Sequence, residues 1–304
     1  MTFDFNSDNG ESYIFDPESF MVPPIEGFLR RMFGARWGLV LVSSPEELDV
    51  DPIMDYLADY SLQLAFYSEF STEREEFEGL QRAEPVLKSI DEVVEEATEA
   101  VPSSETEPAE VGEVEHVPRN PEIVFVPVLD SSNVGVSVEA AMSGRLVFAG
   151  IHAEGSFPAL QEFRRLTGSD HLTAASLMGI LGLNAVRRIC EECKTQYQIE
   201  LNKEECFLLG CNPGTLTIFR GQGCEHCENT GYKDRILISE GFELSENIRT
   251  EILNGTAPRQ LRLIAKKEGM HTLLDSTWEL VEAGETTLDE VSRIADNTDP
   301  GRAD

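Results

Sequence analysis

The chain has 304 residues and a formal net charge of −32, from 56 Asp and Glu against 24 Lys and Arg. The length fits about two domains, and a hydrophobic content of 41% supports a substantial core, which excludes a wholly disordered chain. The charge argues against direct binding to nucleic acid or to an anionic membrane, because both depend on clustered Lys and Arg. Since no apolar run approaches ~20 residues and the acidic N-terminus lacks a signal-peptide pattern, we expect a cytoplasmic protein without membrane insertion.

Alternating strands and helices are expected in the first part of the chain. After an acidic lead-in over residues 1–24, residues 25–35 carry apolar side chains at helical spacing. Residues 37–42 form a Val-rich apolar run that is typical of a buried strand. Residues 61–67 are predicted as a further strand, after a polar turn and a helix. This alternation is typical of an α/β sheet, and we assign residues 25–90 to its first part.

Residues 91–119 differ in composition from the sequence on either side. Between residues 91 and 117 there are ten acidic residues and two prolines, and no Lys, Arg or aromatic residue. Such a sequence buries too little apolar surface to offset the entropy of ordering, so we predict a disordered acidic linker inserted in a domain. Solvation of the linker and competition for a basic groove on a partner both remain open as its role.

The sheet domain is expected to resume at residues 120–189. Residues 122–129 and 145–152 are predicted as strands, whereas residues 157–189 are predicted to be mostly helical because their apolar residues form a stripe. From residue 241 to residue 304, periodic apolar patterns that begin after Ser or Thr and end at Gly predict a helical C-terminal region.

All six cysteines lie between residues 190 and 227. Four of them form two CxxC pairs, namely Cys190, Cys193, Cys224 and Cys227. Two such turns can direct four thiolates at one ion, so we predict a structural Zn²⁺ site in a zinc-binding subdomain at 190–240. Buried thiols without a metal remain the alternative. Cys206 and Cys211 stand among apolar residues and are interpreted as small buried hydrophobic side chains.

Four segments in chain order carry a resemblance to a known family. They are residues 140–152, 181–190, 220–240 and 261–294. The third contains GQGCEHCENTGYKDR, which is similar to the zinc-knuckle pattern GxGCxxCxxTGYxGR of the type II secretion and type IV pilus assembly ATPases. The fourth contains KKEGMHTL and TTLDEV, which are similar to the family's ARKEGMxTL and TTLEEV. The resemblance implies a hexameric, RecA-like P-loop ATPase with a zinc subdomain and a helical C-terminal region.

The phosphate-binding loop of that family is altered in this sequence. The family's strand is followed by GPTGSGKST, whereas this chain reads SPEELDVD after the matching strand. The altered loop lies in a segment that contains Ser43, Ser44, Glu47, Asp49 and Val50. Val50 stands in place of the lysine, and acidic residues replace glycines whose N–H groups cradle phosphate. We therefore expect an α/β fold with a degenerate RecA-like P-loop NTPase core that does not bind ATP.

The family's acidic catalytic residues are also expected to be missing. In the segment that matches the Walker B strand, Val128 replaces the glutamate and Asp130 replaces an arginine. Glu69 matches a second acidic motif only loosely, and His152 matches the family's histidine. His152 has two open interpretations, as a γ-phosphate sensor or as a packed histidine at a strand end. No catalytic residue is therefore expected, with His152 and Glu69 as weak equivalents.

The sequence predicts a catalytically inactive relative of these ATPases that acts as a scaffold or regulator of a type II secretion or type IV pilus assembly system. Two alternatives stay open: an active, unorthodox NTPase of the same family, and a zinc-ribbon interaction module in another pathway. The expected partners are proteins of the secretion or pilus machinery, including an intact ATPase paralogue, and an oligomer is compatible with the resemblance. Attachment to the inner membrane would then run through a protein partner.

Overall fold

The computed structural model describes residues 3–6, 12–15, 23–35, 37–46, 48, 50–70, 86–89, 92, 122–201 and 214–298. The predicted features that lie outside these residues are Glu47, Asp49, Cys206, Cys211 and, apart from Glu92, the linker at 91–119.

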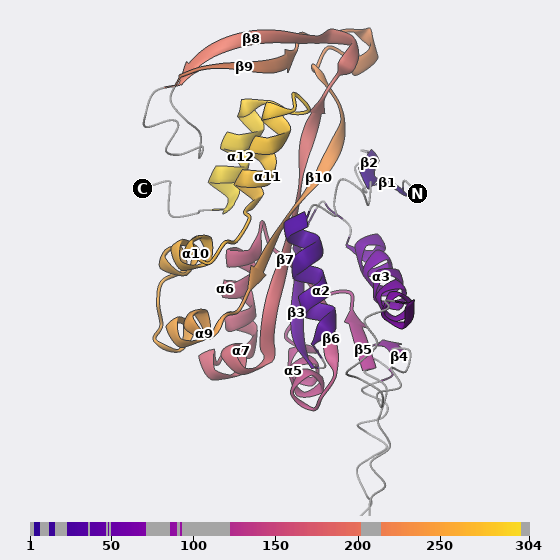
Figure 1. Ribbon diagram of the computed structural model, residues 1–304, viewed down its shortest axis with the longest axis vertical. Helices are drawn as coiled ribbons and strands as arrows, with labels where there is room; N and C mark the ends of the chain where they lie inside the picture. The colour runs from indigo at the N-terminus through magenta and orange to yellow at the C-terminus, as the bar shows by residue number, and fades with distance from the viewer. Residues whose placement is uncertain are drawn as a thin grey trace, which may run out of the picture.

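An eight-stranded sheet runs through the described part of the chain, in the order β1-β2-β10-β7-β3-β6-β5-β4 (Figure 1). Its strands are β1 (Phe3–Asn6), β2 (Ser12–Phe15), β3 (Gly38–Ser44), β4 (Val86–Ser89), β5 (Glu122–Val126), β6 (Leu146–His152), β7 (Leu177–Ile189) and β10 (Tyr232–Glu243). Strands β4, β5, β6, β3 and β7 run parallel, and β10 returns antiparallel to β7. The parallel strands therefore end at one shared carboxyl edge, which is where open α/β sheets bind ligands.

Helices cover both faces of this sheet. One face carries α2 (Pro23–Gly34) and α3 (Asp51–Phe70), and the other carries α5 (Val134–Met142), α6 (Ser156–Thr167) and α7 (Asp170–Ser176). Strand β3 is buried along its whole length, with Val40 and Val42 facing the first layer and Leu39 and Leu41 facing the second. This two-sided burial explains the continuous apolar run at residues 37–42, because a central parallel strand has no solvent face.

Four helices follow β10 in the described part of the predicted C-terminal region, up to residue 298. They are α9 (Glu246–Leu253), α10 (Pro258–Lys267), α11 (Leu273–Glu282) and α12 (Leu288–Thr298). Ser245 and Thr272 cap α9 and α11 by accepting backbone N–H groups, as the sequence predicted. A two-stranded sheet of β8 (Lys194–Leu201) and β9 (Gly214–Gly221) packs on α11 and α12, where Ile218 meets Trp278. Among the described residues, no helix combines the length and apolarity that a membrane crossing requires.

The strand predicted at residues 61–67 is wrong, because α3 continues as one helix from Asp51 to Phe70. A short apolar run fits a buried strand or a buried helix equally well, and no Gly or Pro after Pro52 ends the helix. In the lead-in at 1–24, part of the chain is ordered as the hairpin β1–β2, which meets β10 through the pair Ile14 and Ile236.

The helix predicted through residue 189 is also wrong over its second half. Helix α7 ends at Ser176, and the apolar stripe that follows is the 13-residue strand β7. The stripe contains several Leu residues, which favour helices, but β7 pairs with β3 on one side and β10 on the other, so tertiary pairing overrides propensity. A Cβ on Gly182 would lie 2.8 Å from the Ser156 hydroxyl, so this strand position needs a glycine for α6 to approach.

Candidate metal centre and the carboxyl edge of the sheet

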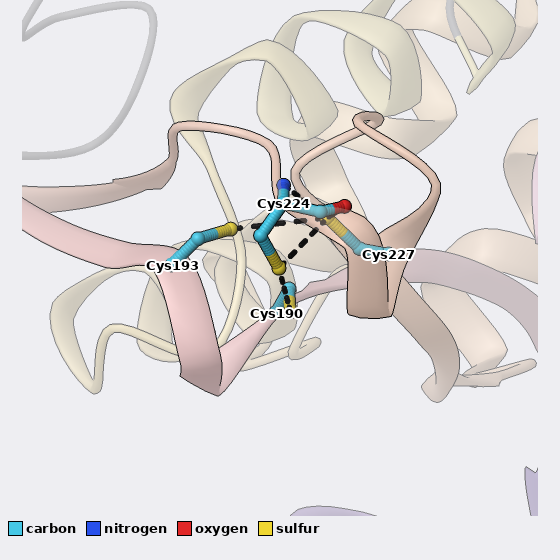
Figure 2. A group of neighbouring side chains, drawn as sticks. All are labelled: Cys190, Cys193, Cys224 and Cys227. Atoms are coloured by element: carbon cyan, nitrogen blue, oxygen red, sulfur yellow. Dashed lines mark hydrogen bonds between the residues drawn. The ribbon is translucent and has the colours of Figure 1, made fainter.

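Two short turns at one end of β7 and β10 bring the four CxxC cysteines together (Figure 2). Cys190 directly follows β7, and Cys193 ends the one-turn helix η1 (Glu191–Cys193) before β8 begins. Cys224 and Cys227 flank the matching turn η2 (Glu225–Cys227), between β9 and β10. His226 lies in the second turn but is exposed to solvent, so it does not join the group.

The four sulfur atoms lie within 4.8 Å of one another. The Sγ–Sγ distances are 3.9 Å from Cys190 to Cys224, 3.8 Å from Cys193 to Cys227 and 3.7 Å from Cys224 to Cys227. A tetrahedron with Zn–S bonds of about 2.3 Å has edges of about 3.8 Å, so the spacing fits one zinc ion. The distances are too long for disulfides, whose sulfurs lie about 2.0 Å apart. The four cysteines could therefore bind a metal such as zinc.

Burial and backbone hydrogen bonds shift the pKa values of three of these thiols in different directions. Burial raises the pKa of Cys190, and it raises the pKa of Cys193 to about 11. Burial also acts to raise the pKa of Cys227, but the N–H groups of Cys224 and Gly231 donate to its sulfur at 3.2 Å and 3.3 Å and lower the value to about 6. The fold thus favours a thiolate at Cys227, the form that binds a metal.

Local hydrogen bonds hold the second turn closed. The N–H of Asn229 donates to the carbonyl of Cys224 at 2.8 Å, and Thr230 donates its N–H and its hydroxyl to the carbonyl of Cys227 at 2.9 Å and 2.6 Å. Glu228 and Asn229 take left-handed backbone angles to make this reversal. The turn therefore holds the thiols of Cys224 and Cys227 close together.

The turns are tied to the C-terminal helices. Next to Cys190, the N–H of Ile189 donates to the carbonyl of Glu285 at 2.8 Å, and the Arg188 guanidinium pairs with the Glu285 carboxylate at 2.9 Å. The hydroxyls of Tyr232 and Thr287 share a hydrogen bond of 2.9 Å. The cysteine group therefore sits where the sheet, the β8–β9 hairpin and α11–α12 meet.

The loop between β3 and α3 lies at the carboxyl edge of the sheet and is filled by its own side chains. The Ser44 hydroxyl donates to the carbonyl of Leu48 at 3.2 Å, and the Leu48 N–H donates to the carbonyl of Pro45 at 3.1 Å. Leu48 and Val50 are both 5% exposed. Val50 also packs close to the position that a Cβ on Gly150 would take, at 3.4 Å. The loop thus folds inward on the core.

The other candidate residues of this edge are separated or otherwise engaged. His152 ends β6 as the register partner of Ser44, and its side chain is exposed. Val128 is 46% exposed after β5. Asp130 accepts hydrogen bonds from Ser132, which lower its pKa. Glu69 lies in the last turn of α3, about 27 Å along the helix from its first residue.

Sequence reasoning missed two buried carboxylates. Glu240 is 2% exposed and accepts the first N–H of α6, at Ser156, at 2.7 Å and the first N–H of α11, at Leu273, at 3.1 Å. Glu290 is fully buried between Arg187 and Arg293. The available signals were a charged residue inside an otherwise apolar pattern and a place in a segment that resembles the family, and neither reveals the partners of the carboxylate.

Comparison with known proteins gives one matching family model, described as Type II/IV secretion system protein, over residues 116–293. The chain is 32% identical over 177 residues to the type IV pilus assembly ATPase PilB of Thermus thermophilus, a match that covers 57% of this chain and 20% of that protein. It is 28% identical over 178 residues to the type II secretion system protein E of Pseudomonas aeruginosa, covering 58% of this chain and 35% of that protein. The match therefore spans only a fifth to a third of these relatives.

Two solved structures share the fold. The ATPase DotB of Yersinia pseudotuberculosis superposes with a TM-score of 0.54 at 10% identity, covering 97% of this chain and 68% of that one. The pilus retraction motor PilT with bound ADP superposes with a TM-score of 0.51 at 11% identity, covering 97% and 77%. At this identity the likeness concerns the α/β fold alone.

Proposed function

Because the chain belongs to the family of type II/IV secretion system proteins, we propose that it serves a secretion or pilus assembly machine as a scaffold or regulator that does not hydrolyse ATP. The observation that carries this proposal is the loop between β3 and α3, which stands where the family resemblance puts the phosphate loop. There Val50 stands in place of the lysine that phosphate needs, acidic residues stand in place of the glycines, and both Leu48 and Val50 are buried.

Charge supports the same conclusion. Glu46 is exposed in the loop and Asp51 opens α3, so carboxylates stand at the helix N-terminus that would otherwise attract an anion. Two like charges about 4 Å apart repel by about 4 kcal/mol at an effective dielectric constant of 20. Glu47 and Asp49 add two more acidic residues to the loop sequence. Binding of a nucleoside triphosphate is therefore disfavoured at the carboxyl edge of the sheet.

The end of β5 lacks a carboxylate that could act on nucleotide or Mg²⁺. Val128 stands at the position of the family's glutamate and has no ionisable group. The nearby Asp130 carboxylate accepts hydrogen bonds from the N–H groups of Ser132 and Asn133, at 2.7 Å and 3.2 Å, at the start of α5. Its role is thus local and structural.

We propose that Cys190, Cys193, Cys224 and Cys227 hold one structural Zn²⁺. Four thiolates close the tetrahedral coordination sphere, so no position is left open for a water or a substrate. The ion would cross-link the ends of β7 and β10 next to the segment that joins α11 and α12. We infer that the cysteine turns and these helices contact other proteins of the machine.

Calorimetric titration with Mg-ATP tests the proposal. We expect no binding at nucleotide concentrations of about 1 mM and no hydrolysis above background. PilB of Thermus thermophilus, which is named as an ATPase, is the positive control in the same buffer. Micromolar binding to this chain would contradict the proposal and favour the alternative of an unorthodox NTPase.

We place the protein, as part of the same proposal, in the cytoplasm with an intact ATPase paralogue as its first candidate partner. Copurification of the two from cells at native levels tests this. A zinc-replete chain that copurifies with no secretion or pilus component would favour the third interpretation, an interaction module of another pathway.

A further inference from the structure

Three neighbouring helices lie at one flank of the molecule, at the left in Figure 1, and each of them exposes a leucine. Leu172 of α7, Leu253 of α9 and Leu263 of α10 are 40%, 46% and 56% exposed. Helix α10 also carries four basic residues and no acidic residue, in a chain of net charge −32. We propose that this flank binds an acidic segment of a partner protein, and that the segment carries apolar side chains for the leucines. The binding face consists of Leu172, Leu253, Arg259, Leu263, Lys266 and Lys267.

Hydrogen bonds fix the directions in which the three helices run. The N–H of Leu244, just before α9, donates to the carbonyl of Met178, just after α7, at 2.9 Å. The Asn247 side chain, in the first turn of α9, donates to the Glu268 carboxylate, just after α10, at 3.0 Å. Helix α9 therefore runs antiparallel to both neighbours, and its last residue, Leu253, lies at the end where α7 and α10 begin. The exposed leucine of α7 stands in the first turn of that helix, so it lies at the same end.

The cations of α10 share one side of the helix with its exposed leucine. Arg259 stands four residues before Leu263, and Lys266 and Lys267 stand three and four residues after it, so all four lie on one face. All four side chains are exposed. In the described part of the chain, neither Arg259 nor Lys267 forms an ion pair, and Lys266 has only a long contact of 3.9 Å with Asp275. The positive charge of this face is therefore available to a partner.

Acidic side chains at the leucine end of α7 and α9 are engaged with other groups. Asp170, the first residue of α7, pairs with Arg164 at 2.7 Å. Glu251, in the last turn of α9, accepts a hydrogen bond from the Thr256 hydroxyl. An exposed apolar surface beside cations suits an acidic peptide, because the leucines supply apolar burial and the cations supply charge pairing.

The overall charge of the chain favours a peptide over an anionic lipid surface. A membrane is a wide plane, so it would also repel the many acidic side chains around the binding face. A peptide contacts the face alone, and at physiological salt charges farther away than about 8 Å are screened. The inference does not rest on the proposed function, because neither nucleotide nor zinc takes part in the contact.

Fluorescence anisotropy of the full chain with a labelled synthetic peptide tests charge and apolar contact separately. The probe is a helical peptide of about 18 residues, or five turns, with Leu on one side and Glu on the others. We expect a Kd below about 100 µM at physiological salt, and weaker binding as salt rises. Arg259→Glu with Lys267→Glu, and separately Leu263→Ser, should each weaken binding at least about tenfold.

Matched variants change exposed residues elsewhere on the protein. Arg220→Glu with Lys233→Glu makes the same change in net charge, and Met142→Ser removes an apolar side chain that is 52% exposed. Both should bind the peptide like the wild type. A wild type that does not bind the peptide, or controls that weaken binding as much as the variants of the face, would overturn the proposal.

A photo-crosslinking amino acid in place of Leu263 identifies the occupant in cells, and the same amino acid in place of Met142 gives the background. We expect adducts with another protein, in which mass spectrometry places the crosslinked residue in a segment with an excess of Asp and Glu. Adducts confined to a second copy of this chain or to its own residues 91–117, or none above the background, would overturn the proposal. Binding of the full chain to phosphatidylglycerol vesicles that is lost in Leu263→Ser would overturn it too, in favour of a lipid surface.

Discussion

Replacing Glu290 by Gln should destabilise the attachment of α12 to the sheet. The Glu290 carboxylate is fully buried and accepts hydrogen bonds from the Arg187 side chain at 2.7 Å and from the Arg293 side chain at 2.9 Å. It also accepts the backbone N–H of Arg187 at 3.2 Å. The substitution keeps the size of the side chain, removes its charge and replaces one acceptor oxygen by an NH2 donor, so it weakens the ion pairs and the hydrogen bonds on one side of the carboxylate together.

The expected loss of stability follows from how deeply Glu290, Arg187 and Arg293 are buried. Breaking a buried ion pair costs about 3–5 kcal/mol when the remaining charge stays buried. Arg187 and Arg293 keep 43% and 34% of their side chains exposed, so water can solvate them in the variant. We therefore expect the free energy of unfolding to fall by about 2–3 kcal/mol at neutral pH, between the buried and the surface limits.

The same interaction predicts a pH dependence. Burial acts to raise the pKa of Glu290, but the hydrogen bonds and charges of Arg187 and Arg293 outweigh it and lower the pKa. A carboxyl group with a lowered folded-state pKa stabilises the protein above its unfolded value of about 4.3, and this contribution is lost as the pH falls through the folded value. The difference between wild type and variant should therefore shrink below about pH 4.

Urea unfolding followed by tryptophan fluorescence measures this loss, because Trp278 lies in α11 beside α12. The matched control is Glu243→Gln, which removes an ion pair with Arg31 whose side chains are 57% and 45% exposed, and should cost less than about 1 kcal/mol. A loss for Glu290→Gln no greater than that of the control, or one that is constant from pH 7 to pH 3, would refute the reasoning.

Three further predictions concern the metal and two packing positions. Elemental analysis should find one zinc ion per chain. The Cys224→Ser variant should lose this zinc under mild chelation, whereas Cys211→Ser should retain it. A wild type that is purified without chelator and lacks stoichiometric metal would contradict the zinc site. Glu240→Ala leaves two buried N–H groups unpaired, so the free energy of unfolding measured in urea should fall by about 2–4 kcal/mol. An unchanged urea midpoint would show that Glu240 does not stabilise the starts of α6 and α11. Gly284→Ala should lower the free energy of unfolding by about 1–3 kcal/mol, because the new Cβ would lie 2.6 Å from the Phe219 ring and residue 284 has a φ of +77°. An unchanged free energy of unfolding would show that the β8–β9 hairpin is not held against α11.

The metal-ligand candidates were accessible from the sequence because CxxC spacing is a local property. Two residues between two thiols favour a tight turn wherever the motif stands. Cys190 with Cys193, and Cys224 with Cys227, could therefore be recognised as ligand pairs without knowledge of the fold. Their convergence from turns 31 residues apart needed the antiparallel pairing of β7 with β10, which brings both turns to one end of the sheet. The capped C-terminal helices were accessible for the same local reason, through Ser245 and Thr272.

The errors at residues 61–67 and 177–189 have a common cause. Both segments are short and rich in apolar residues, and such a run fits a buried helix or a buried strand equally well. Position in the fold then decides: the first segment extends a helix that packs on one face of the sheet, and the second fills the gap between β3 and β10.

The α/β class, the family, the cysteine pairs and the acidic, lysine-free loop after β3 could be predicted without a fold, because each depends on residue identity or on spacing within a few positions. The surroundings of each charged side chain, in contrast, depend on the packed molecule. Glu240 and Glu290 pair with groups that are distant in the chain, and Leu48 became buried by packing in the same hydrophobic cluster as Val40 and Val42 of β3. The physical reason is that burial and hydrogen-bond partnership are properties of the packed molecule, which no local pattern of residues contains.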